Sequence, residues 1–101
     1  MIRCSDNSIY TGITTDIKRR FNEHQSKDEK CAKYTMSHDV KKIEAVWKTE
    51  NKILASKLEY RIKELTKAKK EELIKDNNCF YLFFSNKLEC GRYNRYLLEL
   101  T

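Results

Sequence analysis

Short segments in the first half of the chain have the residue types, or the alternation of apolar and polar positions with a period of two, that are typical of β-strands. Ser8–Thr14 is rich in β-branched and aromatic residues, and the turn-forming pair Asp6-Asn7 separates it from Met1–Cys4. These two segments therefore predict a hairpin. Lys41–Thr49 alternates in the same way and predicts a third strand, in which Trp47 is expected to fill the core rather than to stack on bases.

Two further segments place apolar residues three or four positions apart, which is the period of an amphipathic helix. Thr15 or Asp16 can cap the helix Asp16–His24, whose inward-facing positions are Ile17, Arg20, Phe21 and His24. Asn51–Lys75 predicts one long helix, whose buried stripe consists of Leu54, Leu58, Ile62, Leu65 and Leu73-Ile74. The polar segment Gln25–Val40 is expected to be a loop, which either only connects the elements or contacts a substrate.

These elements predict an α+β fold, in which a small three-stranded antiparallel sheet is flanked by helices. We expect residues 1–76 to form the domain and residues 77–101 to form a C-terminal extension packed on it. Cys79–Phe84 is strand-prone and too apolar to face solvent. Arg92–Tyr96 interleaves arginine with tyrosine, a pattern that can stack bases and contact phosphates, but a structural element covering the core is the favoured interpretation.

Composition narrows the class of protein. A chain of 101 residues with 36% charged residues, two glycines and no proline is typical of one compact, helix-rich domain rather than a disordered chain. The formal net charge of +6 is compatible with phosphate contacts but does not demand them. No segment approaches the roughly 20 apolar residues of a membrane span and no signal-like segment opens the chain, so we expect a cytoplasmic protein. The cysteines lack the spacing of zinc ligands and are expected to be reduced; they are Cys4, Cys31, Cys79 and Cys90.

Arg20, His24 and Glu59 are polar residues at inward-facing helical positions, where apolar residues are the rule. An inward arginine usually contacts an anion or a carboxylate, although Arg20 could also extend past the sheet edge while His24 is merely packed. Glu59 needs a cation, which could be a metal ion, Arg20, or Lys63 one turn later. From the pattern alone, a surface pair between Glu59 and Lys63 is the simpler interpretation.

An ordered set of residues resembles the signature of the GIY-YIG endonucleases, in particular that of the small stand-alone bacterial members. The set consists of Cys4-Ser5-Asp6-Asn7-Ser8, Ile9-Tyr10-Thr11-Gly12-Ile13-Thr14, Arg20, His24, Ala32-Lys33-Tyr34-Thr35 and Glu59. The Tyr-x-Gly triplet alone would be weak evidence. The order and spacing of the whole set make the resemblance specific, and it covers roughly residues 1 to 75.

The resemblance implies a divalent-metal-dependent endonuclease that hydrolyses DNA phosphodiester bonds in DNA repair or processing, with Mg²⁺ or Mn²⁺ as cofactor and DNA as partner. It implies that Glu59 holds the metal ion and that Arg20 binds the scissile phosphate. Tyr10 would act as general base or position the attacking water, and His24 would assist Tyr10 or contact phosphate.

The resemblance also implies residues that contact the substrate without taking part in proton transfer. Gly12 would permit a close approach of the backbone, and Lys33 and Tyr34 would bind the DNA. Whether a partner protein or a second copy of the chain takes part is left open.

Two other functions compete with the endonuclease. The family's first signature strand carries a tyrosine that has no counterpart in Met1-Ile2-Arg3-Cys4, which matches only the end of that strand. The alternative is therefore a catalytically weakened nuclease-fold module that binds nucleic acid without cutting it. A third possibility is a small protein whose basic charge only aids solubility. Metal-dependent cleavage separates the first two functions, and salt-dependent DNA binding separates both from the third.

Overall fold

The computed structural model describes residues 1–27 and 33–96, and the chain divides between Glu44 and Ala45 into two compact units. We call them the first unit and the second unit, and each is described by itself. The α+β class with a three-stranded antiparallel sheet is confirmed. The domain boundary expected after residue 76 stays a prediction. Cys31 and Ala32 lie outside the described residues, and Cys4, Cys79 and Cys90 are free thiols, as expected.

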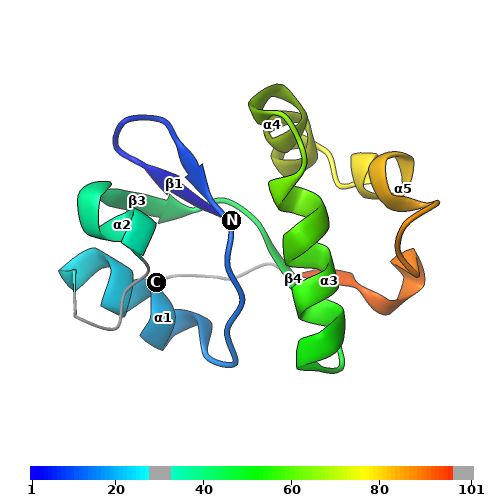
Figure 1. Ribbon diagram of the computed structural model, residues 1–101, viewed down its shortest axis with the longest axis horizontal. Helices are drawn as coiled ribbons and strands as arrows, with labels where there is room; N and C mark the ends of the chain where they lie inside the picture. The colour runs from blue at the N-terminus through cyan, green and yellow to red at the C-terminus, as the bar shows by residue number, and fades with distance from the viewer. Residues whose placement is uncertain (28–32, 97–101) are drawn as a thin grey trace. The chain divides into compact units, whose positions relative to one another are not determined.

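The first unit contains the three-stranded sheet, in which β1 (Ile2–Cys4) lies between β2 (Ile9–Tyr10) and β3 (Val40–Ile43). Both pairings are antiparallel, and β1 and β3 run side by side in Figure 1. Ile2 is paired with Tyr10 on one side and with Ile43 on the other. The predicted hairpin is therefore confirmed, although its second strand is shorter than Ser8–Thr14.

A polar network holds the turn of this hairpin. Asn7 has a φ of 72°, a left-handed conformation that asparagine adopts more readily than most residues. The Arg3 guanidinium donates to the Asn7 carbonyl oxygen at 3.2 Å and to Glu44 Oε2 at 2.9 Å. Burial alone would raise the pKa of Glu44, but hydrogen bonds from Arg3 and Lys42 outweigh it and lower this pKa. The turn and the end of the sheet are thus joined through one arginine.

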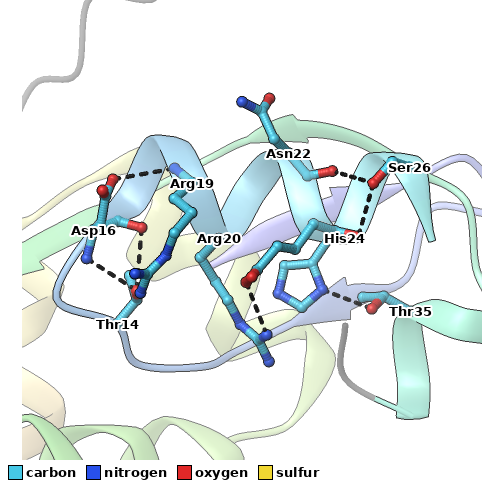
Figure 2. Close-up of polar contacts among 9 residues, drawn as sticks. Thr14, Asp16, Arg19, Arg20, Asn22, His24, Ser26 and Thr35 are labelled. Atoms are coloured by element: carbon cyan, nitrogen blue, oxygen red, sulfur yellow. Dashed lines mark hydrogen bonds and ion pairs between the residues drawn. The ribbon is translucent and has the colours of Figure 1, made fainter. Parts of the chain in front are cut away.

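Two helices lie in the described part of the first unit. In α1 (Ile17–Ser26), the Asp16 side chain accepts a hydrogen bond from the Arg19 N–H at 3.1 Å, which caps the helix as predicted (Figure 2). The helix packs against β3. It ends at Ser26, and the next residue, Lys27, caps it in a left-handed backbone conformation. A second helix, α2 (Lys33–Ser37), lies where the sequence predicted only a loop, so that expectation is wrong for these five residues.

Among its described residues, the second unit contains three α-helices, α3 (Lys52–Lys63), α4 (Lys67–Lys75) and α5 (Asn78–Phe84). The expectation of one long helix over Asn51–Lys75 is wrong. The Thr66 side chain accepts a hydrogen bond from a main-chain N–H in the first turn of α4, and this cap starts a new helix. No helix among the described residues is long and apolar enough to cross a membrane.

A two-stranded antiparallel sheet, formed by β4 (Val46–Lys48) and β5 (Asn94–Tyr96), also belongs to the second unit. The single strand predicted for Lys41–Thr49 is therefore wrong. Its two halves, β3 and β4, belong to different sheets and are separated by Glu44 and Ala45. Alternation with a period of two continues through both halves, so the pattern alone could not mark the division.

The core of the second unit is apolar and partly aromatic. Its buried residues are Ala45, Leu54, Leu58, Ile62, Leu73, Phe80, Phe84 and Tyr93. The strand-prone segment Cys79–Phe84 lies within α5, so the strand expectation is wrong. Phe80 and Phe84 are one helical turn apart and both buried, whereas Tyr81 and Leu82 between them are exposed. A short apolar run does not by itself distinguish a strand from a buried helix.

The arginine- and tyrosine-rich C-terminal segment makes structural contacts within the second unit. The Tyr93 hydroxyl donates to a main-chain carbonyl of α3 at 2.7 Å. The Arg95 guanidinium donates to the last carbonyls of α4 and lies 5.0 Å from the centre of the Trp47 ring. Burial lowers the pKa of Arg95. These contacts agree with the structural interpretation of the segment rather than with a base-stacking role.

Candidate active site

Tyr10 is the last residue of β2, and its half-buried ring contacts two other aromatic rings of the first unit. Its centroid lies 5.3 Å from the imidazole of His24, edge to face, and 5.8 Å from the nearly parallel ring of Tyr34. A Cβ atom at Gly12 would stand 3.0 Å from both Cε1 and Oη of Tyr10. Gly12 therefore leaves space for the tyrosine ring, which is a local reason for a glycine at this position.

His24 lies on the inward face of α1 and is buried together with Thr35 of α2. Its Nδ1 atom lies 2.7 Å from the Thr35 hydroxyl oxygen, and this hydrogen bond fixes the orientation of the ring (Figure 2). Burial lowers the pKa of His24, and the nearby charge of Arg20 lowers it further, while Glu23 acts in the opposite direction. The imidazole beside Tyr10 is therefore neutral at neutral pH.

Arg20 precedes His24 by one helical turn, so the two side chains leave α1 on the same side (Figure 2). One Arg20 contact is an ion pair with Glu23, at 3.3 Å between Nη1 and Oε1. This arginine therefore does meet a carboxylate, one of the two partners expected for it. A guanidinium has five N–H donors, so the contact with Glu23 leaves capacity for a phosphate.

A second aromatic contact links α2 to the turn of the hairpin. Tyr34 stacks on His38 with the ring centres 4.1 Å apart, and His38 Nδ1 lies 2.7 Å from Asp6 Oδ2. Hydrogen bonds from Ser8, followed by the one from His38, lower the pKa of Asp6 to about 2. These contacts hold Tyr34 between the turn and Tyr10. The exposed Lys33 precedes Tyr34 on the same helix.

Glu59 belongs to the second unit, in the middle of α3, and its side chain is 26% exposed. Its Oε2 atom lies 3.6 Å from Lys63 Nζ, so the pair that the sequence offered as the simpler interpretation is formed. Within residues 1–27 and 33–96, no group of three or more His, Cys, Asp or Glu side chains could hold a metal ion. Glu59 would thus be a single protein ligand. This fits Mg²⁺, which usually keeps several waters and binds one or two carboxylates together with substrate phosphates.

The structure gathers part of the predicted set. Tyr10, Gly12, His24 and Tyr34 lie together in the first unit with Arg20 beside them, whereas Glu59 belongs to the second unit. The catalytic and binding roles of all these residues stay predictions.

Three residues that support this cluster have no role that the sequence pattern predicts. They are Thr35, which holds His24, and the pair Asp6 and His38, which holds Tyr34. Their partners are 11 and 32 residues away in the chain, so no local pattern could reveal them. Thr11 lies between Tyr10 and Gly12 in the sequence. Its hydroxyl is buried and has no hydrogen-bond partner among the described residues. Buried polar atoms without a partner are rare in native proteins.

Comparison with known proteins identifies similar sequences. The GIY-YIG catalytic domain family matches residues 1–72. The UPF0213 protein FN1575 of Fusobacterium nucleatum is 46% identical over 80 residues, which cover 79% of this chain and 78% of that protein. The UPF0213 protein YhbQ of Salmonella typhimurium is 38% identical over 86 residues, which cover 85% of this chain and 84% of that protein. YhbQ of Escherichia coli O127:H6 is 41% identical over 80 residues, with 79% and 78% covered. No solved structure matches the chain.

Proposed function

The chain belongs to the GIY-YIG family, and we propose that it is a divalent-metal-dependent endonuclease that hydrolyses DNA phosphodiester bonds in DNA repair or processing. One observation carries the proposal: the Tyr10 ring packs on a buried, hydrogen-bonded His24, with Arg20 one turn earlier on the same helix. All three lie within the residues that match the family. Because the relatives are bacterial, we place the activity in the cytoplasm, where bacterial DNA lies.

The proposed reaction needs a water molecule to attack phosphorus while the bond to one bridging oxygen breaks. Tyr10 positions this water or takes its proton. The neutral imidazole of His24 can in turn accept a proton from Tyr10. The hydrogen bond between His24 and Thr35 restrains the imidazole, so the ring keeps one orientation toward Tyr10. Gly12 leaves the space in which the Tyr10 ring lies.

Arg20 stabilises the negative charge that accumulates on the phosphate as the water attacks. The ion pair with Glu23 orients its guanidinium, which can still donate to phosphate oxygens. Lys33 and Tyr34 both lie on α2, and the Tyr34 ring stacks on Tyr10. We assign both residues to contacts with the DNA strand.

Glu59 would hold the Mg²⁺ or Mn²⁺ ion, which supplies charge neutralisation at the phosphate and the leaving oxygen. Its carboxylate is only partly exposed, and its ammonium partner is 3.6 Å away, a weak pair that a divalent ion can displace. A second candidate function is the nuclease-fold module that binds nucleic acid without cutting it. The observation in its favour is that Lys63 already satisfies Glu59.

The test is cleavage of labelled single-stranded, duplex and branched DNA by the full chain, with Mg²⁺ or Mn²⁺. Glu59→Gln and Arg20→Gln should each lower the rate by about 100- to 1,000-fold, the usual cost of removing one group that stabilises the transition state. Glu72→Gln is the matched control, since it removes an exposed helical carboxylate and should change nothing. DNA binding without metal is measured in parallel. If the chain binds all three DNAs but cuts none of them with either metal, the non-cutting module is the correct function.

A further inference from the structure

An open pocket of about 690 Å³ lies along α3 in the second unit. We call it the α3 pocket. Four of its lining residues are cations, and the large apolar or aromatic ones include Ile53 and Tyr60. The cations are Lys52, Lys57, Arg61 and Lys87. Lys87 belongs to the segment after α5, so the C-terminal part of the chain helps to build the pocket.

The pocket is strongly positive because four cations line it and none of its lining residues, within the part of the chain that the structure describes, is a carboxylate. Arg61 pairs with Glu64 outside the pocket at 2.9 Å. Lys52, Lys57 and Lys87 make no ion pair with any of the described residues. Like charges gathered without partners repel one another, so such a cluster favours an anionic ligand that spans several of them.

Exposed apolar residues distinguish this surface from an ordinary lysine-rich helix face. Tyr60 is 61% exposed and Ile53 is 70% exposed, and both line the same pocket. The Arg61 guanidinium lies over the Tyr60 ring, 5.3 Å from its centre. An exposed aromatic ring among cations is the arrangement that binds unpaired nucleic-acid strands, in which bases stack on rings while phosphates contact lysine and arginine. The bases of a duplex are already stacked on one another and gain little from such a ring.

Glu59, the proposed metal ligand, lies on the same helix as the pocket. The helical pocket residues recur in pairs four positions apart, 52–53, 56–57 and 60–61, and so form one face of α3. The buried stripe of Leu54, Leu58 and Ile62 lies on the opposite side. Glu59 lies between the two faces, three residues after Ser56, which lines the pocket. A strand with a phosphate at Glu59 can therefore continue directly onto the pocket.

We propose that the α3 pocket binds an unpaired nucleic-acid strand and holds the part of the substrate next to the scissile bond. The link to the scissile bond rests on the proposed nuclease function, whereas strand binding by the pocket does not. The pocket would make a single-stranded segment, rather than a fully paired duplex, the preferred substrate.

Binding is measured by fluorescence anisotropy with the full chain, without metal, using a labelled DNA strand, the same strand as RNA, and the DNA duplex. Tyr60→Ser should weaken single-strand binding by about tenfold, and Tyr60→Phe should restore it, because stacking needs the ring and not the hydroxyl. Replacing Lys52 and Lys57 with glutamine should reduce the slope of log affinity against log salt by about 0.7 per lysine. The RNA arm shows whether the site accepts any unpaired strand or only DNA.

Matched controls come from the same unit. Tyr81→Ser removes a tyrosine that is 67% exposed on α5, and Lys75→Gln removes a lysine on α4; neither lines the pocket. Both should leave affinity and salt slope unchanged. Circular dichroism melts check that all variants remain folded. Equal losses for Tyr60→Ser and Tyr81→Ser, or equal affinity for the single strand and the duplex, would overturn the proposal.

Cleavage assays separate this proposal from the proposed function. If the chain cuts DNA, the pocket variants should raise KM and leave kcat unchanged, whereas Glu59→Gln should lower kcat. If the chain cuts nothing but the Tyr60 and lysine variants still weaken strand binding, the nuclease function fails and the α3 pocket stands. If cleavage occurs and the pocket variants leave KM unchanged, the pocket fails and the nuclease stands.

Discussion

The two units of the chain differ in what they bury. In the described part of the first unit, the buried polar side chains Thr11, His24 and Thr35 accompany three buried apolar residues, Met1, Cys4 and Phe21. In the second unit, the buried residues of the described part are aliphatic and aromatic. Burying polar groups is costly unless they are hydrogen-bonded, so a small unit gains little stability from keeping them. The functional cluster that we propose around Tyr10 would explain why the first unit buries them.

The two units also differ in how they hold a candidate functional side chain. His24 is fixed from inside by the buried hydroxyl of Thr35, which restrains its ring before any substrate arrives. Glu59 lies on a helix whose stability depends on apolar packing. Among the described residues, its carboxylate pairs with the half-exposed Lys63 at 3.6 Å, which is a weak ion pair. The first arrangement suits proton transfer, which needs a fixed geometry. The second suits a metal ligand, because the carboxylate must release the lysine ammonium before it can bind a metal ion.

The largest expected effect on stability tests the apolar side of this contrast. Leu73 of α4 is completely buried. Leu73→Ala should lower the free energy of unfolding by about 3 kcal/mol, because it removes buried apolar surface and leaves a cavity. Urea unfolding followed by circular dichroism measures it. Leu82→Ala, at an exposed position of α5, should change this free energy by less than about 0.5 kcal/mol. Similar losses for the two variants would contradict the apolar core assigned to the second unit.

A matched substitution in the first unit should act mainly on activity. Thr35 is as completely buried as Leu73, and Thr35→Val keeps its shape while removing the hydroxyl. An unpaired buried imidazole nitrogen should cost about 1 kcal/mol of stability. The reoriented His24 should lower kcat by about tenfold with little change in KM, and Thr35→Ser should restore most of it.

A spectroscopic measurement separates this positioning role from a merely structural one. The nitrogen chemical shifts of His24 report which ring nitrogen carries the proton. Thr35→Val should change the balance between the two neutral forms, and Thr35→Ser should return it to that of the natural protein. Unchanged nitrogen shifts in Thr35→Val would show that the hydroxyl does not control His24.

A smaller effect is expected at Gly12. The new methyl group of Gly12→Ala would meet the Tyr10 ring at 3.0 Å, so the ring must move by a few tenths of an ångström. Because the contact is with the end of a side chain, stability should change by less than about 1 kcal/mol. The rate of cleavage should fall several-fold, since a displaced tyrosine no longer meets the attacking water correctly. Gly91→Ala is the control, because a Cβ there meets nothing within 4 Å.

Local signals predicted the parts of the fold that depend on nearby residues. The hairpin followed from the turn at Asp6-Asn7, and the start of α1 followed from the cap at Asp16. The sequence does not mark the break between α3 and α4, because Leu65 and Leu73 continue the apolar stripe at helical spacing on both sides of Thr66. Only the formed hydrogen bond identifies Thr66 as a cap. The division of Lys41–Thr49 was missed because each half finds a different partner strand far along the chain.

The candidate site shows the same limit. Tyr10, Arg20 and His24 were selected because their spacing matches a known signature, and the structure gathers them in one unit. Thr35 stood in the same signature without a role, because its importance comes from a hydrogen bond across 11 residues. Helical spacing placed Glu59 on the edge of a buried stripe, but spacing cannot tell whether its cation is Lys63 or a metal ion.

The last prediction concerns pH and uses the buried His24. Burial and Arg20 lower its pKa below the ordinary value of 6.5, so the unfolded chain binds a proton here more readily than the folded chain. The contribution of the neutral imidazole to stability is therefore fully present above about pH 6.5 and is lost as pH falls through the lower pKa of the folded state. Urea unfolding of the natural protein and of His24→Gln should show a stability difference that shrinks with falling pH. The pH dependence of this stability difference reports on His24 alone, because the two proteins share every carboxylate and the other imidazole. A difference that stays constant from pH 8 to pH 5 would mean that His24 is not held neutral by burial, and the proton-accepting role beside Tyr10 would lose its support.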